Sequence, residues 1–267
     1  MDGVSLIAGN GVLPSLFAQG ARARGLRVCM VSHEGETDPG AERLADEVRR
    51  VRVGQLGAVV KALTAFGNRR VAFVGGVGKT KLFSVRPDLA AVRLLAKARD
   101  LRDDTLLRAL AAHLEGRGFS VVPCTDCVPE LLAAPSVMGR ARPTAAQRKD
   151  AAAGLELLDA LAPFATGQSV VIRAGVAMAV EAIEGTDAAI ARAGALGAKG
   201  ASLVKAAKRG QDLRFDVPAV GPATMRNCRA AGITAVFLEA GRTMLLGRAE
   251  TLAEADRLGV AVTGVGR

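Results

Sequence analysis

The chain has 267 residues, of which 50% are hydrophobic and 23% are charged, so it can form one large core or two modest ones and is not intrinsically disordered. The formal net charge of +10 favours anionic partners such as phosphates or an acidic membrane surface. The chain has no Trp and no Tyr, which disfavours a nucleic-acid binder that stacks bases on aromatic rings.

The first half of the chain alternates short β-rich runs with helical runs. We predict strands at residues 4–8, 26–31, 71–74 and 119–122, and helices at about 12–24, 54–65 and 104–117. Such alternation is typical of a mainly parallel sheet with helices on both faces. The first strand follows the N-terminus without the basic start and long apolar core of a signal peptide, so we expect a cytoplasmic protein.

Proline and glycine then interrupt this pattern between residues 129 and 143, which predicts a linker. We expect an N-terminal domain at 1–132, a linker at 133–143 and a C-terminal domain at 144–267. The pattern of the second half predicts an α+β arrangement with hairpins. Its strands are expected at 169–172, 176–183, 233–238, 244–246 and 260–262, and its helices at 144–160, from 185, from 222 and at 249–258.

Four cysteines are present, and two of them form a C-x-x-C. A zinc site would need a second such pair, or histidines at suitable spacing, beside Cys124 and Cys127. The other two, Cys29 and Cys228, are isolated in the sequence. We therefore expect core or loop thiols rather than a metal or redox centre.

Two glycine-rich turns follow predicted strands. In the first, Gly9, Asn10 and Gly11 open a helix, where backbone can approach a phosphate, but Pro14 stands where a dinucleotide fingerprint needs a third glycine. The second turn contains Lys79, yet Phe73 replaces the first glycine of a phosphate-binding P-loop. The turns disfavour NAD and ATP as ligands. Each is open to two interpretations, a contact with substrate phosphate or a plain structural turn.

Two acidic segments have a similar ambiguity. Asp103 and Asp104 begin a predicted helix, where one carboxylate is explained as an N-cap and the pair less easily. In the segment Glu184-Gly185-Thr186-Asp187, Thr186 suits an N-cap and Asp187 suits the first helical turn. A structural role accounts for both segments, and a role in a site remains the alternative.

The segment from Lys205 to Gly221 is the densest in charge and has no convincing helical or strand period. It contains Lys208, Arg214 and Asp216, and the helix that starts at Pro222 offers free N–H groups to an anion. Pyrophosphate cleavage needs cations to neutralise phosphate and a carboxylate to hold Mg²⁺ or orient water. A polar surface loop is the alternative.

Four of these segments together, in this order, resemble the family of UDP-2,3-diacylglucosamine pyrophosphatases that is unrelated to calcineurin-like phosphoesterases. They are IAGNGVLP at residues 7–14, DDTLLR at 103–108, EGTD at 184–187 and QDLRFDVPAVG at 211–221. The resemblance covers nearly the whole chain. It implies a Rossmann-like N-terminal domain, a separate C-terminal α/β domain, and hydrolysis of UDP-2,3-diacylglucosamine to UMP and 2,3-diacylglucosamine 1-phosphate in lipid A synthesis.

The resemblance also implies a divalent metal, usually Mg²⁺, and assigns the essential aspartate of its R-x-D-x-P-x-x-G stretch to Asp216. We expect Asp187 to share the metal. The predicted substrate-binding residues are Gly9, Asn10, Gly11, Lys79, Thr186, Lys205, Lys208 and Arg214. The expected partner is the lipid-linked UDP-sugar, with peripheral inner-membrane contact and oligomeric state left open. The main rival is a non-catalytic protein that binds a nucleotide sugar or lipid phosphate, followed by a Rossmann oxidoreductase.

Overall fold

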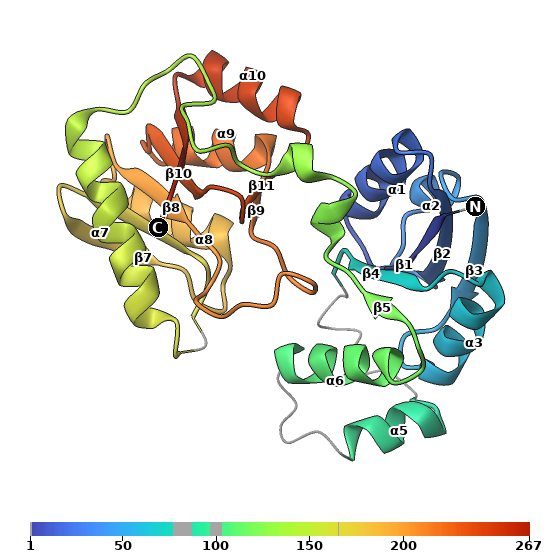
Figure 1. Ribbon diagram of the computed structural model, residues 1–267. Helices are drawn as coiled ribbons and strands as arrows, with labels where there is room; N and C mark the ends of the chain where they lie inside the picture. The colour runs from blue at the N-terminus through green and yellow to red at the C-terminus, as the bar shows by residue number, and fades with distance from the viewer. Residues whose placement is uncertain (1, 77–86, 97–102, 165) are drawn as a thin grey trace. The chain divides into compact units, whose positions relative to one another are not determined.

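In the computed structural model the chain forms two compact units, Met1–Pro129 and Glu130–Arg267 (Figure 1). The structure describes residues 2–76, 87–96, 103–164 and 166–267. Each unit contains a five-stranded sheet of its own. The α/β class that the sequence predicts is therefore confirmed for both halves of the chain.

The first unit is built on a parallel sheet with the strand order β3-β2-β1-β4-β5, which confirms the Rossmann-like prediction. The strands are β1 Gly3–Ala8, β2 Arg27–His33, β3 Glu47–Val51, β4 Arg70–Val74 and β5 Ser120–Val121. The helices are α1 Leu13–Ala23, α2 Pro39–Glu42, α3 Leu56–Phe66, α5 Leu89–Leu95 and α6 Asp103–Glu115. Helices α1 and α3 cover opposite faces of the sheet, as right-handed crossovers to its two sides require (Figure 1).

The central and edge strands of this sheet differ in their side chains. Strand β1 is buried along its whole length, which explains its continuous apolar sequence. Strand β3 lies at the edge, and its residues Arg49 and Arg50 are exposed. Charged residues on an edge strand discourage pairing with other chains.

The second unit contains a mixed sheet with the order β12-β10-β8-β6-β7. Strands β8, β10 and β12 are parallel, whereas β6 runs antiparallel to both β7 and β8, so the predicted hairpin is confirmed. The strands are β6 Ser169–Arg173, β7 Val176–Val180, β8 Ser202–Lys205, β10 Ala235–Glu239 and β12 Ala261–Val265, with the short pair β9 Ala219–Val220 and β11 Met244–Leu245 beside them. The helices are α7 Ala145–Leu161, α8 Thr186–Ala195, α9 Pro222–Ala230 and α10 Arg248–Leu258.

Alternate residues of these strands pack against different helices. On one face Val204 and Phe237 meet Leu158 of α7. On the other face Leu203 and Leu238 belong to a larger cluster contributed by α8, α9 and α10. The period of two along each strand thus divides the second unit into three layers, with a core on each side of the sheet.

Residues 133–143, where the sequence suggests a linker, are hydrogen-bonded to the backbone of the second unit. Ala133 N donates to Thr243 O at 2.8 Å, and Met138 N donates to Val262 O at 2.9 Å. The division between the compact units lies earlier, after Pro129. All four cysteines are buried thiols. Within the described ranges no helix has the length and apolar character needed to cross a membrane.

Candidate active site

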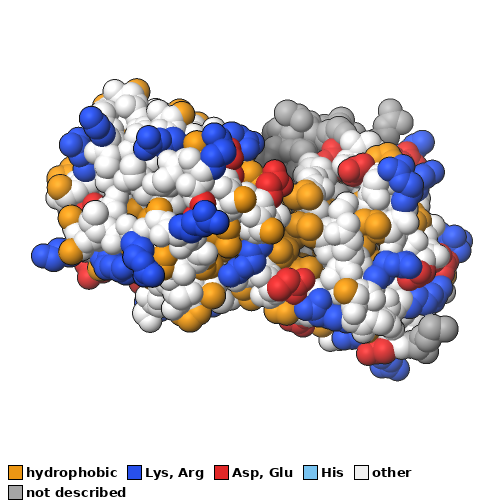
Figure 2. Space-filling view, turned by 90° about the horizontal axis from the view of Figure 1, so that it is seen from above, with side chains coloured by type: hydrophobic (Ala, Val, Ile, Leu, Met, Phe, Trp, Pro, Cys, Tyr) orange, Lys and Arg blue, Asp and Glu red, His pale blue; other side chains and the backbone are white. Residues whose placement is uncertain are grey.

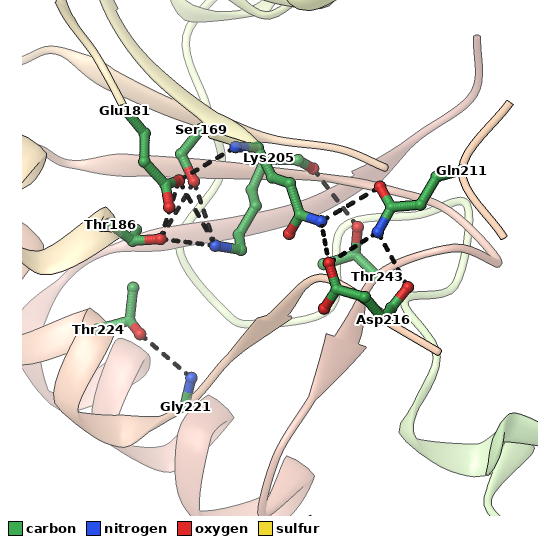
Figure 3. Close-up of polar contacts among 10 residues, drawn as sticks. Ser169, Glu181, Thr186, Lys205, Gln211, Asp216, Gly221, Thr224 and Thr243 are labelled. Atoms are coloured by element: carbon green, nitrogen blue, oxygen red, sulfur yellow. Dashed lines mark hydrogen bonds and ion pairs between the residues drawn. The ribbon is translucent and has the colours of Figure 1, made fainter. Parts of the chain in front are cut away.

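Lys205 is the last residue of β8, and its side chain is buried although it carries an amine. The residue is 5% exposed. Its Nζ donates to Thr186 Oγ1 at 2.7 Å and to Ser169 Oγ at 3.2 Å, and lies 3.9 Å from Glu181 Oε2 (Figure 3). Ser169 pairs directly with Lys205 across the antiparallel strands, so the sheet register fixes this part of the site.

The charges around Lys205 act on its protonation in opposite directions. Burial lowers the pKa of the amine because the ammonium loses hydration. Glu181, Asp216 and Asp187 oppose that shift, since each carboxylate stabilises the ammonium. The Cys228 thiol also faces the amine, and burial raises the pKa of that thiol to about 12, so it is neutral at physiological pH.

Asp216 lies in the loop between β8 and β9 and is exposed. Its Oδ2 accepts hydrogen bonds from Gln168 Nε2 at 2.7 Å and from Gln211 Nε2 at 2.9 Å (Figure 3). Gln211 Nε2 also donates to the backbone oxygen of Asp216 at 2.9 Å. Among the described residues Oδ1 accepts no hydrogen bond, which leaves this oxygen available to a ligand.

Arg214, two residues before Asp216 in the sequence, directs its guanidinium to a different aspartate. The Arg214 guanidinium forms its ion pair with Asp212, with Nη2 to Oδ2 at 2.8 Å, and lies 5.2 Å from the ring centre of Phe215. Asp212 also accepts from Arg214 N at 3.1 Å. The tight loop brings Asp212 and Arg214 together, so the guanidinium pairs with Asp212. Asp216 is held instead by the side-chain amides of Gln168 and Gln211.

Thr186 and Asp187 open α8, but the N-cap is Gly185 rather than Thr186. Gly185 has a φ of 84°, a conformation that glycine adopts without strain. The Thr186 hydroxyl instead accepts from Lys205 and donates to Glu181 Oε2 at 3.0 Å. Asp187 Oδ1 accepts from Asn227 Nδ2 at 2.9 Å. Thr186 therefore belongs to the site through its side chain.

The sequence-predicted residues divide between the two units. Thr186, Lys205 and Asp216 share one electrostatic cluster in the second unit. Lys208 lies in the same loop as Asp216, and its backbone N donates to Gln211 Oε1 at 2.8 Å. Its amine forms no hydrogen bond or ion pair within the described part of the chain, so it is available to an anion.

The first unit holds the predicted turn of Gly9, Asn10 and Gly11. Asn10 N donates to Gly76 O at 2.7 Å, and the Asn10 amide donates to Glu36 Oε2 at 2.8 Å. A Cβ on Gly9 would stand 2.0 Å from Gly76 O, so this position requires glycine for packing alone. Contact of the turn with substrate remains a prediction. Lys79 lies outside the described residues.

Sequence reasoning did not single out Gln168, Ser169 or Glu181. Gln168 precedes β6, Ser169 is its first residue and Glu181 follows β7, so these polar residues border the apolar runs of residues 170–172 and 176–180. A polar residue at the end of a buried strand is a weak signal for a site, because most such residues only mark the strand end. Their convergence becomes visible only when the register of β6 with β7 and β8 is known.

Asp216 and Asp187 are the two carboxylates that the sequence assigns to Mg²⁺. In the described ranges, no three or more His, Cys, Asp or Glu residues cluster as a metal cage. Mg²⁺ commonly takes one or two carboxylates, several waters and phosphate oxygens of the substrate. Asp216 suits this use because it is exposed and Oδ1 is available. Asp187 is also exposed and uses Oδ1 for Asn227, which leaves Oδ2.

Comparison with known proteins covers both units. Residues 3–131 match the model of the LpxI N-terminal domain, and residues 134–263 match that of the LpxI C-terminal domain. The chain belongs to the LpxI family. It is 31% identical to the UDP-2,3-diacylglucosamine pyrophosphatase LpxI of Caulobacter vibrioides, over 99% of this chain and 98% of that relative. The LpxI family membership agrees with the resemblance of the four motifs.

Solved structures give more distant likenesses. The biotin carboxylase domain of a thermophilic 2-oxoglutarate carboxylase is 14% identical with a TM-score of 0.30, covering 64% of this chain and 35% of that one. The L-amino acid ligase of Bacillus licheniformis is 12% identical with a TM-score of 0.30, covering 68% and 39%. This LpxI family member thus spans little more than a third of the length of either structure.

Proposed function

We propose that this protein hydrolyses the pyrophosphate of UDP-2,3-diacylglucosamine to UMP and 2,3-diacylglucosamine 1-phosphate, a step of lipid A biosynthesis. The observation that carries the proposal is the near full-length match to the LpxI of Caulobacter vibrioides, which is named a UDP-2,3-diacylglucosamine pyrophosphatase. The second unit offers suitable chemistry, with a buried ammonium and an exposed carboxylate in one cluster. A binding protein would not need that carboxylate.

The reaction adds water across the phosphoanhydride. The oxygen of water bonds to one phosphorus, the bridging oxygen leaves with the other phosphate, and a proton of the water passes to a base or to solvent. Asp216 is proposed to orient this water or to hold Mg²⁺, with Asp187 as the second carboxylate. A bound Mg²⁺ would supply positive charge to the phosphate oxygens.

Cationic and N–H groups bind the phosphates in this proposal. The buried ammonium of Lys205 neutralises negative charge of the phosphates, and burial strengthens its electrostatic effect. Lys208 provides a second amine, and the Thr186 end of α8 provides backbone N–H groups. We retain Gly9, Asn10, Gly11, Lys79 and Arg214 as proposed substrate contacts. The guanidinium of Arg214 is oriented by its ion pair with Asp212.

Purified protein incubated with UDP-2,3-diacylglucosamine and Mg²⁺ should release UMP, measured by chromatography. Excess chelator should abolish the release, and added Mg²⁺ should restore it. Equal turnover in excess chelator would contradict the metal requirement. Absence of turnover with every divalent metal tested would favour the non-catalytic binding protein.

A further inference from the structure

Glu181 follows β7 and turns inward beside the buried amine. Its side chain is 12% exposed. Its Oε2 accepts from Thr186 Oγ1 at 3.0 Å and from Gln168 N at 3.3 Å, and lies 3.9 Å from Lys205 Nζ (Figure 3). The carboxylate is thus fixed by donors from α8 and from the residue before β6, and it has no role in the proposed chemistry so far.

The hydroxyl of Thr186 connects this carboxylate to the amine. A threonine hydroxyl has one proton to donate and lone pairs to accept. Thr186 donates its hydroxyl hydrogen bond to Glu181. The lone pairs of Thr186 Oγ1 are therefore directed to the Lys205 ammonium, whose Nζ lies at 2.7 Å. With Ser169 Oγ as its second acceptor, the ammonium is held from two sides.

Glu181 is also the nearest counter-charge. Among the described residues, Glu181 is the carboxylate that forms an ion pair with Lys205 within 4.0 Å. Asp216 and Asp187 act on the amine from farther away. A buried ammonium without a close counter-ion tends to lose its proton or to move toward water. Glu181 therefore supplies both the charge and, through Thr186, the direction that Lys205 needs.

We propose that Glu181 is a positioning residue for the hydrolysis, which keeps the Lys205 ammonium charged and in place through Thr186 without touching substrate. The inference rests on the proposed pyrophosphatase function and adds a residue to its site. Glu181 acts on Lys205, and Lys205 acts on the phosphates. Four titratable groups act electrostatically on the amine: Glu181 after β7, Asp187 on α8, Asp216 before β9 and Cys228 on α9.

The test is Glu181→Gln, which keeps the shape of the side chain and removes its charge. On the alkaline side of the pH profile we expect kcat to fall roughly tenfold with KM little changed, at the lower end of the losses known for the hydrogen-bond partners of metal ligands. Removing a negative charge makes the ammonium easier to deprotonate. The alkaline limb of the kcat profile should therefore move to lower pH by about one unit, with near-normal activity at acidic pH.

Glu156→Gln is the matched control, because this glutamate is exposed on α7 and lies outside the cluster around Lys205. Its pH profile should equal that of the wild type. Thr186→Val removes the connecting hydroxyl and should lower kcat, whereas Thr186→Ser should restore most of the loss. If Glu181→Gln fails to fold, judged by its melting temperature, the Thr186 pair decides the proposal.

Titration of the Lys205 amine by ¹⁵N NMR, without substrate, separates this inference from the proposed function. The signal is assigned by its loss in Lys205→Arg. We expect the amine to titrate at lower pH in Glu181→Gln than in the wild type, whether or not the protein releases UMP. An unchanged titration together with an unchanged alkaline limb, or equal activity of Thr186→Val and Thr186→Ser, would overturn the proposal.

Discussion

At the scale of single residues, Asp216 owes its orientation to amides rather than to a cation. Gln168 and Gln211 both donate to Oδ2, and neither neutralises the carboxylate. An Arg or Lys in their place would compete with a metal or a phosphate-bound water for the negative charge. The amides hold the carboxylate still and leave its charge for a ligand at Oδ1.

Asp216→Ala should therefore remove hydrolysis while the fold is retained. We expect the rate to fall by about 10²-fold or more, as when other preorganised electrostatic groups are deleted. The residue is exposed, so the melting temperature should change little. Substrate affinity should suffer less, because Lys205 and Lys208 remain. Turnover, calorimetric affinity and thermal melting measure the three quantities.

The control for Asp216→Ala is Glu156→Ala, which removes an exposed acid on α7. Asp212→Ala would be a poor control, since Asp212 holds Arg214 and is only partly exposed. Glu156→Ala should turn over substrate like the wild type. Near-normal turnover of folded Asp216→Ala would show that the catalytic assignment is wrong and would direct attention to Asp187.

At the scale of elements, the strands with apolar runs were predictable and the polar ones were not. Strand β8 was missed because Ser202 and Lys205 flank only two apolar residues, and a buried lysine is rare. Strand β3 was missed because its arginines belong to an exposed edge. Both strands depend on neighbours that are distant in sequence, and local pattern does not encode them.

The same limit explains which parts of the candidate site were predicted. The loop with Asp216 was recognisable from its charges and its motif. Its partner Gln168 was not, because Gln168 lies 48 residues earlier and meets Asp216 only after β6 pairs with β8. Arg214 stands two residues from Asp216 in the sequence, yet the loop turns this arginine toward Asp212.

Strand β12 provides a test of packing at the element scale. A Cβ on Gly264 would stand 1.8 Å from the backbone oxygen of Ala134, and Gly264 N donates to Ser136 O at 2.9 Å. Backbone cannot yield as a flexible side chain does. We expect Gly264→Ala to lower the free energy of unfolding by about 3 kcal/mol, measured by denaturant titration.

Gly266→Ala is the control two residues along the chain. A Cβ there would meet no atom within 4 Å, so the free energy of unfolding should stay within about 0.5 kcal/mol of the wild type. Equal stabilities of the two variants would mean that the segment around Ala134 moves away from β12 at little cost. That result would contradict the close docking of this segment on the sheet.

At the scale of the whole molecule, the positive charge is dispersed. On the face drawn in Figure 2, Lys and Arg side chains are spread over both units with Asp and Glu among them. Many of the arginines form surface ion pairs, such as Arg22 with Asp46 and Arg257 with Glu254. Such surface pairs contribute little to stability. Because Lys and Arg residues outnumber Asp and Glu residues, the chain keeps a net charge of +10.

A dispersed positive net charge predicts a weak attraction to anionic membranes, and salt should abolish this attraction. We expect the protein to sediment with vesicles containing phosphatidylglycerol at low ionic strength, to be released at about 0.5 M salt, and to ignore neutral phosphatidylcholine vesicles. The matched variant is Ile183→Ser, because Ile183 is 93% exposed and lies two residues from Glu181. If charge alone attracts the protein, this variant sediments like the wild type. Binding to neutral vesicles that resists salt and is lost in Ile183→Ser would instead indicate apolar insertion beside the site, and would contradict the electrostatic prediction.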